Sequence, residues 1–308
     1  MKYALFPGCK IPYYVSQYET SSRAVLGKMG VDLEDIEFSC CGYPVRHLNF
    51  QAFLLSGARN LALAERNGLD IITPCKCCFG TLKKAVYLLK EKPSLRELIN
   101  RELRKEGLEY GGDSDVKHVL SVLFHEVGLV AIAQKIVRPF IDLKIAVHYG
   151  CHALRPGKVV QFDNPMNPTL FEKLVEVTGA QSIEWPRRLQ CCGNPLWGKN
   201  SELAVNLAES KLADAREQGA DYLCVACTYC HIQFDHVQQE MLTAGRMGKG
   251  LPSILYPQLL GLSMGMDAET VGIGKNRMDT SGVVNFLFTP EEESAASQQG
   301  EWKQSDNG

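Results

Sequence analysis

The chain has 308 residues, a formal net charge of −2, and 45% hydrophobic against 22% charged residues. This length allows two domains, and the composition is that of an ordinary globular protein. The near-zero charge gives no electrostatic reason to expect nucleic acid or an anionic membrane as a partner, and the longest apolar stretch, 119–147, carries too many charged residues for a transmembrane segment.

The first half of the chain is predicted to alternate strands and helices, as a parallel α/β fold does. Short β-rich runs lead toward cysteines, and apolar patterns with a helical period end at Gly30 and Gly68. In chain order we expect a strand at 2–6, a helix at 16–29, a short strand at 36–39, a helix at 50–67, a strand at 69–73 and a helix at 80–90.

The second half is predicted to repeat this order of elements. We expect a strand at 144–148, a helix at 168–178, a short strand at 182–185, a helix at 201–218, a strand at 220–225 and a helix at 232–242. The apolar segment 251–266 is typical of core, with an interface as the alternative. The predicted fold class is therefore α/β, with two pseudo-symmetric halves that are each a small, mostly parallel sheet with flanking helices.

Domain boundaries follow from the composition between and after these halves. The charged stretch 91–116 is predicted to be a surface helix and loop, and 116–138 one or two bridging helices. The last residues are rich in Ser, Gln and Glu and are expected to be a disordered tail. We predict a first cysteine-rich domain with its linker at 1–115, bridging helices at 116–143, a second cysteine-rich domain at 144–289 and the tail at 290–308.

Ten of the twelve cysteines form two copies of one pattern: a single cysteine, an adjacent pair, and a closing Cys-x-x-Cys. The gaps are 30 and 33 residues in the first copy and 39 and 34 in the second, and glycine and then, one residue later, proline follow each adjacent pair. Because strand ends of parallel sheets meet at one edge, we expect the thiols of each copy to converge. The two pentads are Cys9, Cys40, Cys41, Cys75 and Cys78, and Cys151, Cys191, Cys192, Cys227 and Cys230.

Five thiolates exceed what an ordinary metal site requires. A structural zinc ion takes four ligands, and a cubane iron–sulfur cluster takes four cysteines. Adjacent side chains diverge, so an adjacent pair is better suited to two irons of an open cluster than to one small ion. The pattern favours an unusual iron–sulfur assembly in each half; zinc in one half, or free cysteines that only pack as small hydrophobes, are the alternatives.

The redox compartment also follows from the cysteines. The run Met1–Cys9 has too short an apolar stretch for a signal peptide and is predicted to begin with a strand. Twelve cysteines without an export signal indicate a reducing, cytoplasmic compartment, where clustered thiols usually hold metal or perform redox chemistry.

The repeated motif resembles the cysteine-rich (CCG) domain found in the B subunit of heterodisulfide reductase. The resemblance covers about residues 1 to 265, and related domains occur in iron–sulfur subunits of glycerol-3-phosphate, lactate and succinate oxidoreductases. Segments beyond the ligands carry the likeness: Leu5-Phe6-Pro7-Gly8-Cys9, Phe38-Ser39-Cys40-Cys41, Ala58-Arg59-Asn60-Leu61 and Cys75-Lys76-Cys77-Cys78-Phe79-Gly80-Thr81-Leu82.

The resemblance implies two noncubane [4Fe-4S] clusters, one held by each pentad, that face each other across an active site between the halves. A disulfide such as that of coenzyme M and coenzyme B would enter this gap and receive one electron from each cluster. The residues placed at the cleft as catalytic cluster ligands are Cys9, Cys41, Cys151 and Cys192. The resemblance also implies a complex in which a ferredoxin-like protein carries cubane [4Fe-4S] clusters and a further protein contains flavin.

Three histidines beside the second pentad are candidate catalytic residues. His148 and His152 flank Cys151, and His231 follows Cys230, so each could donate a hydrogen bond to sulfur or a proton to a leaving thiolate. The alternative is a partly exposed loop histidine with no role.

Several other residues near the motifs are expected to be bystanders. Cys77 and Cys224 lie outside the pentads and are predicted to be buried without a ligand role, with Cys77 as an extra ligand the alternative. Lys10, Arg46 and Lys76 could attract an anionic substrate, but loop cations usually face solvent.

Four functions remain open from the sequence. The first is the catalytic component of a disulfide reductase, and the second is a similar component running in the oxidative direction on lipoate-bound or protein-bound sulfur. The third is an electron-transfer component of a glycerol-3-phosphate or lactate type of oxidoreductase, and the fourth is a zinc-stabilised scaffold. Two complete pentads favour the first two, while the substrate is not written in the sequence.

Overall fold

The computed structural model describes residues 1–288, which form two four-stranded parallel sheets with flanking helices. The two sheets share one strand order, β2-β1-β3-β4 in the first half and β6-β5-β7-β8 in the second. The predicted α/β fold of two pseudo-symmetric halves is therefore confirmed. The predicted tail at 290–308 lies outside the described residues.

The strands of both sheets are short, and their inner members are buried. The first sheet consists of β1 Lys2–Leu5, β2 Asp32–Asp35, β3 Asp70–Thr73 and β4 Val116–His118, and the second of β5 Lys144–His148, β6 Gln181–Ile183, β7 Tyr222–Val225 and β8 Ser253–Leu255. The central pairs run in register, with Leu5 opposite Ile72 and Val147 opposite Cys224. Because all pairs are parallel, the carboxyl ends of the strands in each sheet lie at one edge.

Corresponding helices cover the sheets in the two halves. The first half contains α1 Ile11–Tyr14, α2 Ser16–Lys28, α3 Phe50–Arg66, α4 Lys76–Glu91 and α5 Pro93–Leu103; the connection contains α6 Val119–Ser121 and α7 Leu129–Ala133; and the second half contains α8 Cys151–Leu154, α9 Gly157–Val160, α10 Leu170–Glu176, α11 Ser201–Glu217, α12 Thr228–Ile232, α13 Gln238–Thr243 and α14 Tyr256–Ser263. The long helices α3 and α11 begin alike: the side chain of Asn49 accepts a hydrogen bond from the backbone N–H of Ala52, and that of Asn200 from Leu203.

Two strands differ from the expectation for a simple reason. Val116–His118, expected to begin the bridging helices, is the edge strand β4 of the first sheet, and 253–255 of the predicted core segment is its counterpart β8. Three-residue strands carry too little alternation to be recognised in a sequence. The short strand that we expected at 36–39 lies earlier in the chain, as β2 Asp32–Asp35. The segment that leads to Cys40 is therefore a loop.

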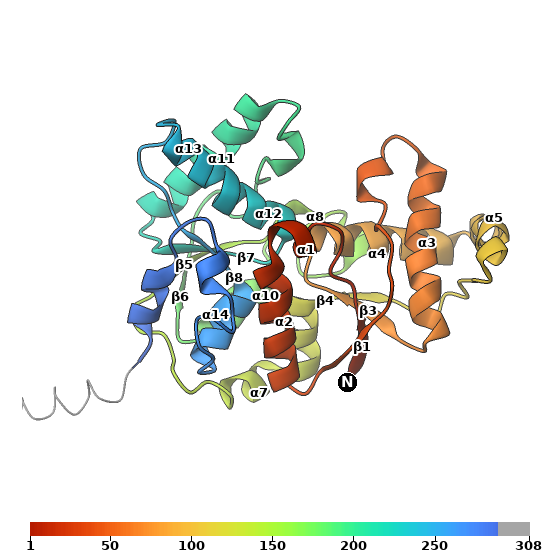
Figure 1. The fold of residues 1–308 in the computed structure, drawn as a ribbon, viewed down its shortest axis with the longest axis horizontal. Coiled ribbons are helices and arrows are strands. Elements are labelled where there is room, and N and C mark those ends of the chain that lie inside the picture. Colours follow the sequence, from red (N-terminus) through yellow and green to blue (C-terminus); the bar gives the residue numbers. More distant parts are fainter. Residues whose placement is uncertain (289–308) are drawn as a thin grey trace, which may run out of the picture.

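The halves pack directly against each other through helices (Figure 1). Helix α2 of the first half lies against α14 of the second, and α4 lies against α8 and α9. The approach is close at Gly80, where a Cβ atom would stand 2.5 Å from the carbonyl oxygen of His152. This close contact brings the amino-terminal end of α4, which carries the closing cysteines of the first pentad, to the second half.

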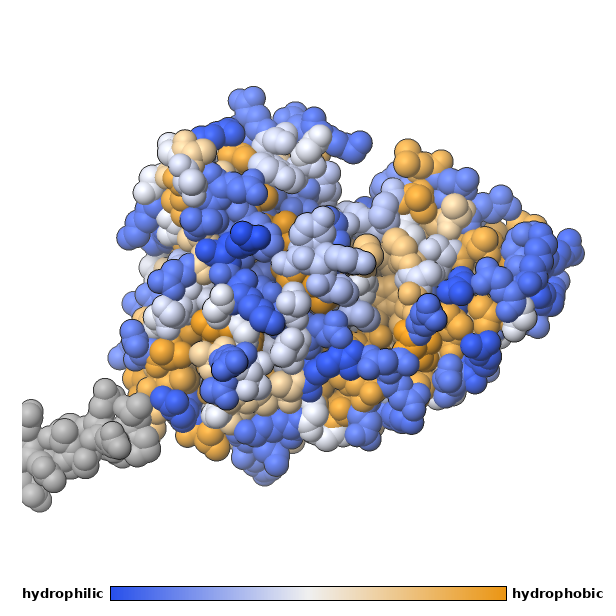
Figure 2. Space-filling model, viewed as in Figure 1, coloured by the Kyte–Doolittle hydropathy of each residue, from blue (hydrophilic) through white to orange (hydrophobic). Residues whose placement is uncertain are grey.

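None of the helices within residues 1–288 has the length and apolar character needed to cross a bilayer. In the view of Figure 2, hydrophilic residues cover most of this face and apolar residues form separate patches.

Candidate metal centre

Both pentads lie at the carboxyl-terminal edges of their sheets. Strands β1 and β3 lead to Cys9 and Cys75, and strands β5 and β7 lead to Cys151 and Cys227. The adjacent pairs lie in the loops before α3 and α11. All twelve cysteines are free thiols, and within each pentad they range from exposed or half-buried to fully buried. The duplicated sequence pattern therefore corresponds to two equivalent clusters of thiols.

The glycine before each single cysteine makes room for a thiol of the closing Cys-x-x-Cys. Gly8 and Gly150 adopt φ values of +77° and +73°, which residues other than glycine rarely adopt. A Cβ atom on Gly8 would stand 2.8 Å from the Sγ atom of Cys78, and one on Gly150 would stand 3.4 Å from that of Cys230. The Gly-Cys sequence thus lets two strand-end loops approach closely enough to share one site.

The glycine after each adjacent pair turns the backbone toward sulfur. Gly42 and Gly193 adopt φ values of +86° and +87°, and each donates its N–H to the first sulfur of its pair, Cys40 or Cys191, at 3.4 Å. A Cβ atom on Gly193 would stand only 2.7 Å from the carbonyl oxygen of Ala204, and the equivalent approach in the first half is 2.9 Å. The Cys-Cys-Gly motif is therefore a stereochemical requirement in both halves.

The first sulfur of each adjacent pair is the one that most readily carries negative charge. Hydrogen bonds from neighbouring thiols lower the pKa of Cys40 to about 2 and that of Cys191 to about 2. Hydrogen bonding to that thiolate raises the pKa of the thiols that donate to it. The donors are Cys41 and Cys9 to Cys40, and Cys151 and Cys192 to Cys191.

The two pentads meet at three thiols from different halves. The sulfur atoms of Cys75, Cys77 and Cys227 all lie within 4.8 Å of one another, and the distance from Cys77 Sγ to Cys227 Sγ is 3.8 Å. Cys77 also lines both hollows that the pentads form. The residue expected to be a bystander therefore lies at the junction between the two groups of thiols.

Two of the three predicted histidines contact cysteines. The Nε2 atom of His148 is 3.3 Å from Cys230 Sγ. His152 Nδ1 is 3.4 Å from Cys77 Sγ and 3.6 Å from Cys151 Sγ. Burial lowers the pKa of both rings, to about 4 in His152, where the Arg46 guanidinium lowers it further. Both imidazoles are therefore neutral at pH 7.

The structure does not bring His231 or Cys224 to the thiols of the pentads. His231 is fully buried beside Gln17, Ser253 and Asp235, and its pKa falls to about 3 because burial disfavours the charged ring. Within residues 1–288, no hydrogen bond joins its ring to a cysteine. Cys224 is buried in strand β7, and burial raises its pKa.

Two fully buried lysines border the second pentad. Lys76 was expected to face solvent, but its side chain is 0% exposed and lies among aromatic rings of the second half, with Nζ 4.5 Å from the ring centre of Phe171. Lys211 of α11 lies over Trp185 and donates to the carbonyl oxygen of Arg187. Burial lowers the pKa of each lysine to about 8.

The burial of Lys211 can be recognised from the pattern of apolar residues along its helix, although the spacing of the cysteines does not indicate it. The residue falls on the same helical face as Ala204, Ala208 and Ala215, which are all buried. A lysine within such an apolar stripe indicates a buried cation with a specific partner. The sequence holds no comparable signal for Lys76, because its burial depends on the packing of the other half.

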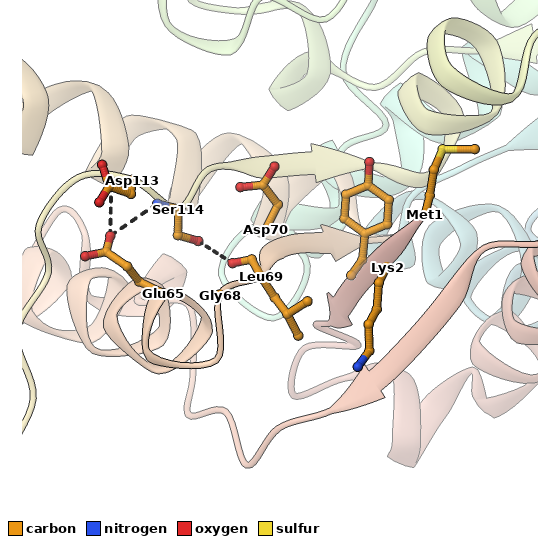
Figure 3. A pocket seen from close by; sticks show the side chains of 9 residues that line it. Met1, Lys2, Glu65, Gly68, Leu69, Asp70, Asp113 and Ser114 are labelled. Atoms are coloured by element: carbon orange, nitrogen blue, oxygen red, sulfur yellow. Dashed lines mark hydrogen bonds between the residues drawn. The ribbon is translucent and has the colours of Figure 1, made fainter.

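Another hollow, of about 500 Å³, lies at the opposite edge of the first sheet (Figure 3). It is bordered by Lys2, Glu65 and Asp70 among others, and no cysteine lines it. The carboxylate of Glu65 is fully engaged, since it accepts hydrogen bonds from the backbone N–H groups of the four residues 111–114. This hollow shows neither the soft ligands nor the unpaired polar groups of a redox site.

The residues around the pentads fit iron–sulfur clusters. Thiolates are the ligands that such clusters prefer, and the free thiols converge in two groups. The Nζ atom of Lys76 is buried with no hydrogen-bond partner among the described residues, as expected where an anionic group completes the site. These features define a duplicated α/β protein whose cysteine groups are suited to bind metal or iron–sulfur.

Comparison with known proteins identifies this class. The family model described as CCG, cysteine-rich domain, matches residues 3–83 and 145–235. The B subunit of the ferredoxin/F420H2-dependent CoB-CoM heterodisulfide reductase of Methanosarcina acetivorans is 35% identical over 93% of this chain and 96% of its own length. The chain therefore belongs to the family of duplicated CCG-domain proteins that includes the B subunit of heterodisulfide reductase.

Other relatives have different names. The 8-methylmenaquinol:fumarate reductase membrane anchor subunit of Wolinella succinogenes is 32% identical over 91% of this chain and 98% of its own length. Lactate utilization protein A of Macrococcus caseolyticus is 22% identical over 76% of this chain and 88% of its own length. A hypothetical protein from Helicobacter pylori has the same fold, with a TM-score of 0.71 at 18% identity over 90% of this chain and 51% of that one.

Proposed function

We propose that this chain is the catalytic B subunit of a heterodisulfide reductase or a closely similar complex, and that it reduces or forms a disulfide such as that of coenzyme M and coenzyme B. The observation that carries the proposal is the junction of two complete pentads at Cys75, Cys77 and Cys227. A disulfide requires two electrons, and two one-electron sites side by side supply them without leaving a free thiyl radical.

In this proposal the two pentads hold two noncubane [4Fe-4S] clusters. The ligands are Cys9, Cys40, Cys41, Cys75 and Cys78 in the first half and Cys151, Cys191, Cys192, Cys227 and Cys230 in the second. Such a cluster, when bound, exchanges single electrons and offers iron to a thiolate sulfur. Among the ten thiols, Cys9 is exposed, and Cys40, Cys151 and Cys191 are half-buried.

His152 is the hydrogen-bond donor to sulfur that the geometry favours. Arg46 donates a hydrogen bond to Nε2 of this ring at 2.9 Å, so the proton of the neutral imidazole resides on Nδ1. That atom faces Cys77 and Cys151, where a thiolate product would need a hydrogen bond. His148 contacts Cys230 deeper in the protein and is proposed to orient that ligand.

Aromatic rings cover the junction and limit the access of water. The ring of Tyr43 lies 5.3 Å from that of His152 and 5.3 Å from that of Tyr229, measured between centroids. Tyr229 borders both hollows. A shielded site of this kind strengthens electrostatic interactions with the sulfur atoms and protects reactive thiolates from side reactions.

The partners follow from what residues 1–288 do not supply. We propose that a ferredoxin-like partner with cubane [4Fe-4S] clusters delivers the electrons, and that a flavin-containing protein lies beyond it. Exposed apolar side chains after the two Cys-Cys-Gly motifs, Leu48 and Phe50 in the first half and Trp197 and Leu203 in the second, are suited to bind such a partner. The free cysteines support a reducing, cytoplasmic setting.

One alternative has its own support. The match to the Wolinella fumarate reductase protein covers nearly the whole of that chain, which favours a role in electron transfer to or from a quinone. An oxidative role on lipoate-bound sulfur would use the same site in reverse. A zinc ion in one half would leave only one redox-active site.

The test combines metal analysis with activity. Protein purified without oxygen should contain about eight irons and eight sulfides with little zinc, since two four-iron clusters are expected. With a reduced viologen dye as donor, it should reduce the coenzyme M–coenzyme B disulfide. Full reconstitution with two zinc ions would refute the cluster assignment. Two clusters together with quinone reduction but no disulfide reduction would instead support the electron-transfer role.

A further inference from the structure

The two metal sites differ in buried positive charge. Both Lys76 and Lys211 border the second pentad, with side chains that are 0% and 1% exposed. A buried ammonium group is stabilised by anionic partners, and a thiolate-bound cluster would add to the carboxylate of Glu172, which also acts on Lys76. The inference drawn from this asymmetry rests on the proposed function, because it assumes a cluster in each pentad.

Lys76 belongs to the first half but serves the second. It follows Cys75 at the start of α4, and its ammonium group lies 4.5 to 5.6 Å from the ring centres of Phe171, Tyr149 and Phe162. Its side chain lines the second hollow together with Cys77 and the complete second pentad, Cys151, Cys191, Cys192, Cys227 and Cys230.

Gly150 shows how close Lys76 comes to the ligands. A Cβ atom on this glycine would lie 3.7 Å from Lys76 Cδ and 3.4 Å from Cys230 Sγ. The lysine stem and the cysteine therefore both approach the position that a side chain of Gly150 would occupy. The Nζ atom has no hydrogen-bond partner within residues 1–288, so its charge is free to face the cluster.

Lys211 supplies a second buried charge from within the second half. Its ammonium group donates to the carbonyl oxygen of Arg187, which stands four residues before Cys191 in the loop that carries the adjacent pair. It lies 4.5 Å from the ring centre of Trp185, and its side chain is 1% exposed. The second pentad thus has Lys76 in the hollow that its thiols line and Lys211 beside the loop that leads to its adjacent pair.

The first pentad has neutral residues at both equivalent positions. Thr228 follows Cys227 as Lys76 follows Cys75, and it lines the first hollow. Asn60 stands eleven residues after the cap of α3, as Lys211 stands eleven after the cap of α11, and its amide donates to the carbonyl oxygen of Cys40. The lysine that lines the first hollow, Lys10, is partly exposed to solvent.

We propose that Lys76 and Lys211 give the cluster of the second pentad the higher reduction potential, so that a single electron entering the pair resides there. Reduction adds a negative charge, which a nearby cation in a poorly screened interior stabilises. When the two clusters together hold one electron, the first cluster would be oxidised and the second reduced. The two structurally similar halves would thereby have different roles in electron transfer, because the cluster of the first half would donate electrons to that of the second.

The experiment measures the midpoint potentials of both clusters in the full-length, cluster-loaded protein by anaerobic redox titration with electron paramagnetic resonance. The charge-removing variants are Lys76→Met and Lys211→Met, which keep the side-chain length or volume similar. Lys83→Met is the matched control, because this lysine lies two turns further along α4 and pairs with Asp115 at 3.0 Å. Cys9→Ala and Cys151→Ala proteins, each with one cluster, assign the signals to the halves.

The expected result is a downward shift of the second potential alone in both charge-removing variants, and no shift in Lys83→Met. Loss of iron from the second site in Lys76→Met, restored by Lys76→Arg, would also support the proposal. Unchanged potentials in loaded Lys76→Met and Lys211→Met protein, or a shift of the first potential instead, would overturn it. Two loaded clusters without disulfide reductase activity would reject the proposed function while leaving this comparison valid.

Discussion

Replacing Gly193 by alanine tests the reason for the Cys-Cys-Gly motif. The glycine has a φ of +87°, and its N–H group donates to Cys191 Sγ at 3.4 Å. In Gly193→Ala, the new Cβ would lie 2.7 Å from the carbonyl oxygen of Ala204, a backbone atom that cannot rotate away. The loop and the start of α11 must therefore separate, which moves the adjacent cysteines relative to the rest of the pentad.

The expected cost has two parts that the structure allows us to separate. Forcing alanine into the left-handed region costs about 1–2 kcal/mol. The collision with the helix backbone adds about 1–3 kcal/mol, as overpacking in a protein core does. Gly219→Ala is the matched control, since this glycine has a φ of +84° but no atom within 4 Å of its Cβ position. It should lose only the first part.

The assay is urea unfolding of the anaerobically purified proteins, followed by circular dichroism, together with their iron content. We expect Gly193→Ala to unfold at lower urea than Gly219→Ala and to lose iron from the second site, while Gly219→Ala keeps the iron of the parent protein. Equal stability of the two variants with full iron content would show that the close approach to Ala204 does not matter.

Three further predictions concern the ligands and acid stability. Cys192→Ala should lose iron from one site, whereas Cys224→Ala should keep both clusters and lose about 1–2 kcal/mol of packing energy. Iron analysis of both variants distinguishes a ligand from a buried bystander. The opposite pattern would contradict the assignment of the second pentad. Cys151→Ala should not reduce a disulfide even with excess dye, and full activity would make the chain an electron relay. Burial lowers the pKa of His118 in the folded protein to about 3. Between pH 6.5 and 3, the unfolded state therefore binds more protons than the folded state, and the free energy of unfolding falls as the pH decreases. This group contributes up to about 1.4 kcal/mol per pH unit to that fall. His118→Asn should therefore flatten the acid limb of a pH–stability curve, and an unchanged slope would contradict the assignment.

The sequence by itself determined the class of site and the duplication of the fold. Cysteine is rare enough, and the spacing of the two pentads regular enough, that chance repetition is excluded. The central strands and long helices were also readable, because each carries its own apolar pattern and ends at a glycine such as Gly68 or Gly219. These features depend on residues close together in the chain, so the sequence displays them directly.

Contacts between the halves could be decided only by the tertiary structure. Cys77 lies beside Cys227, and Lys76 lies among rings of the other half, because α4 packs closely on α8 at Gly80. His231 follows a ligand in sequence yet points away from the pentad toward Ser253, since the helix that begins at Thr228 rotates successive side chains by about 100°. Sequence spacing specified which residues lie in the same loop or helix, but the packing of helices on two sheets decided which of them face the sulfur atoms.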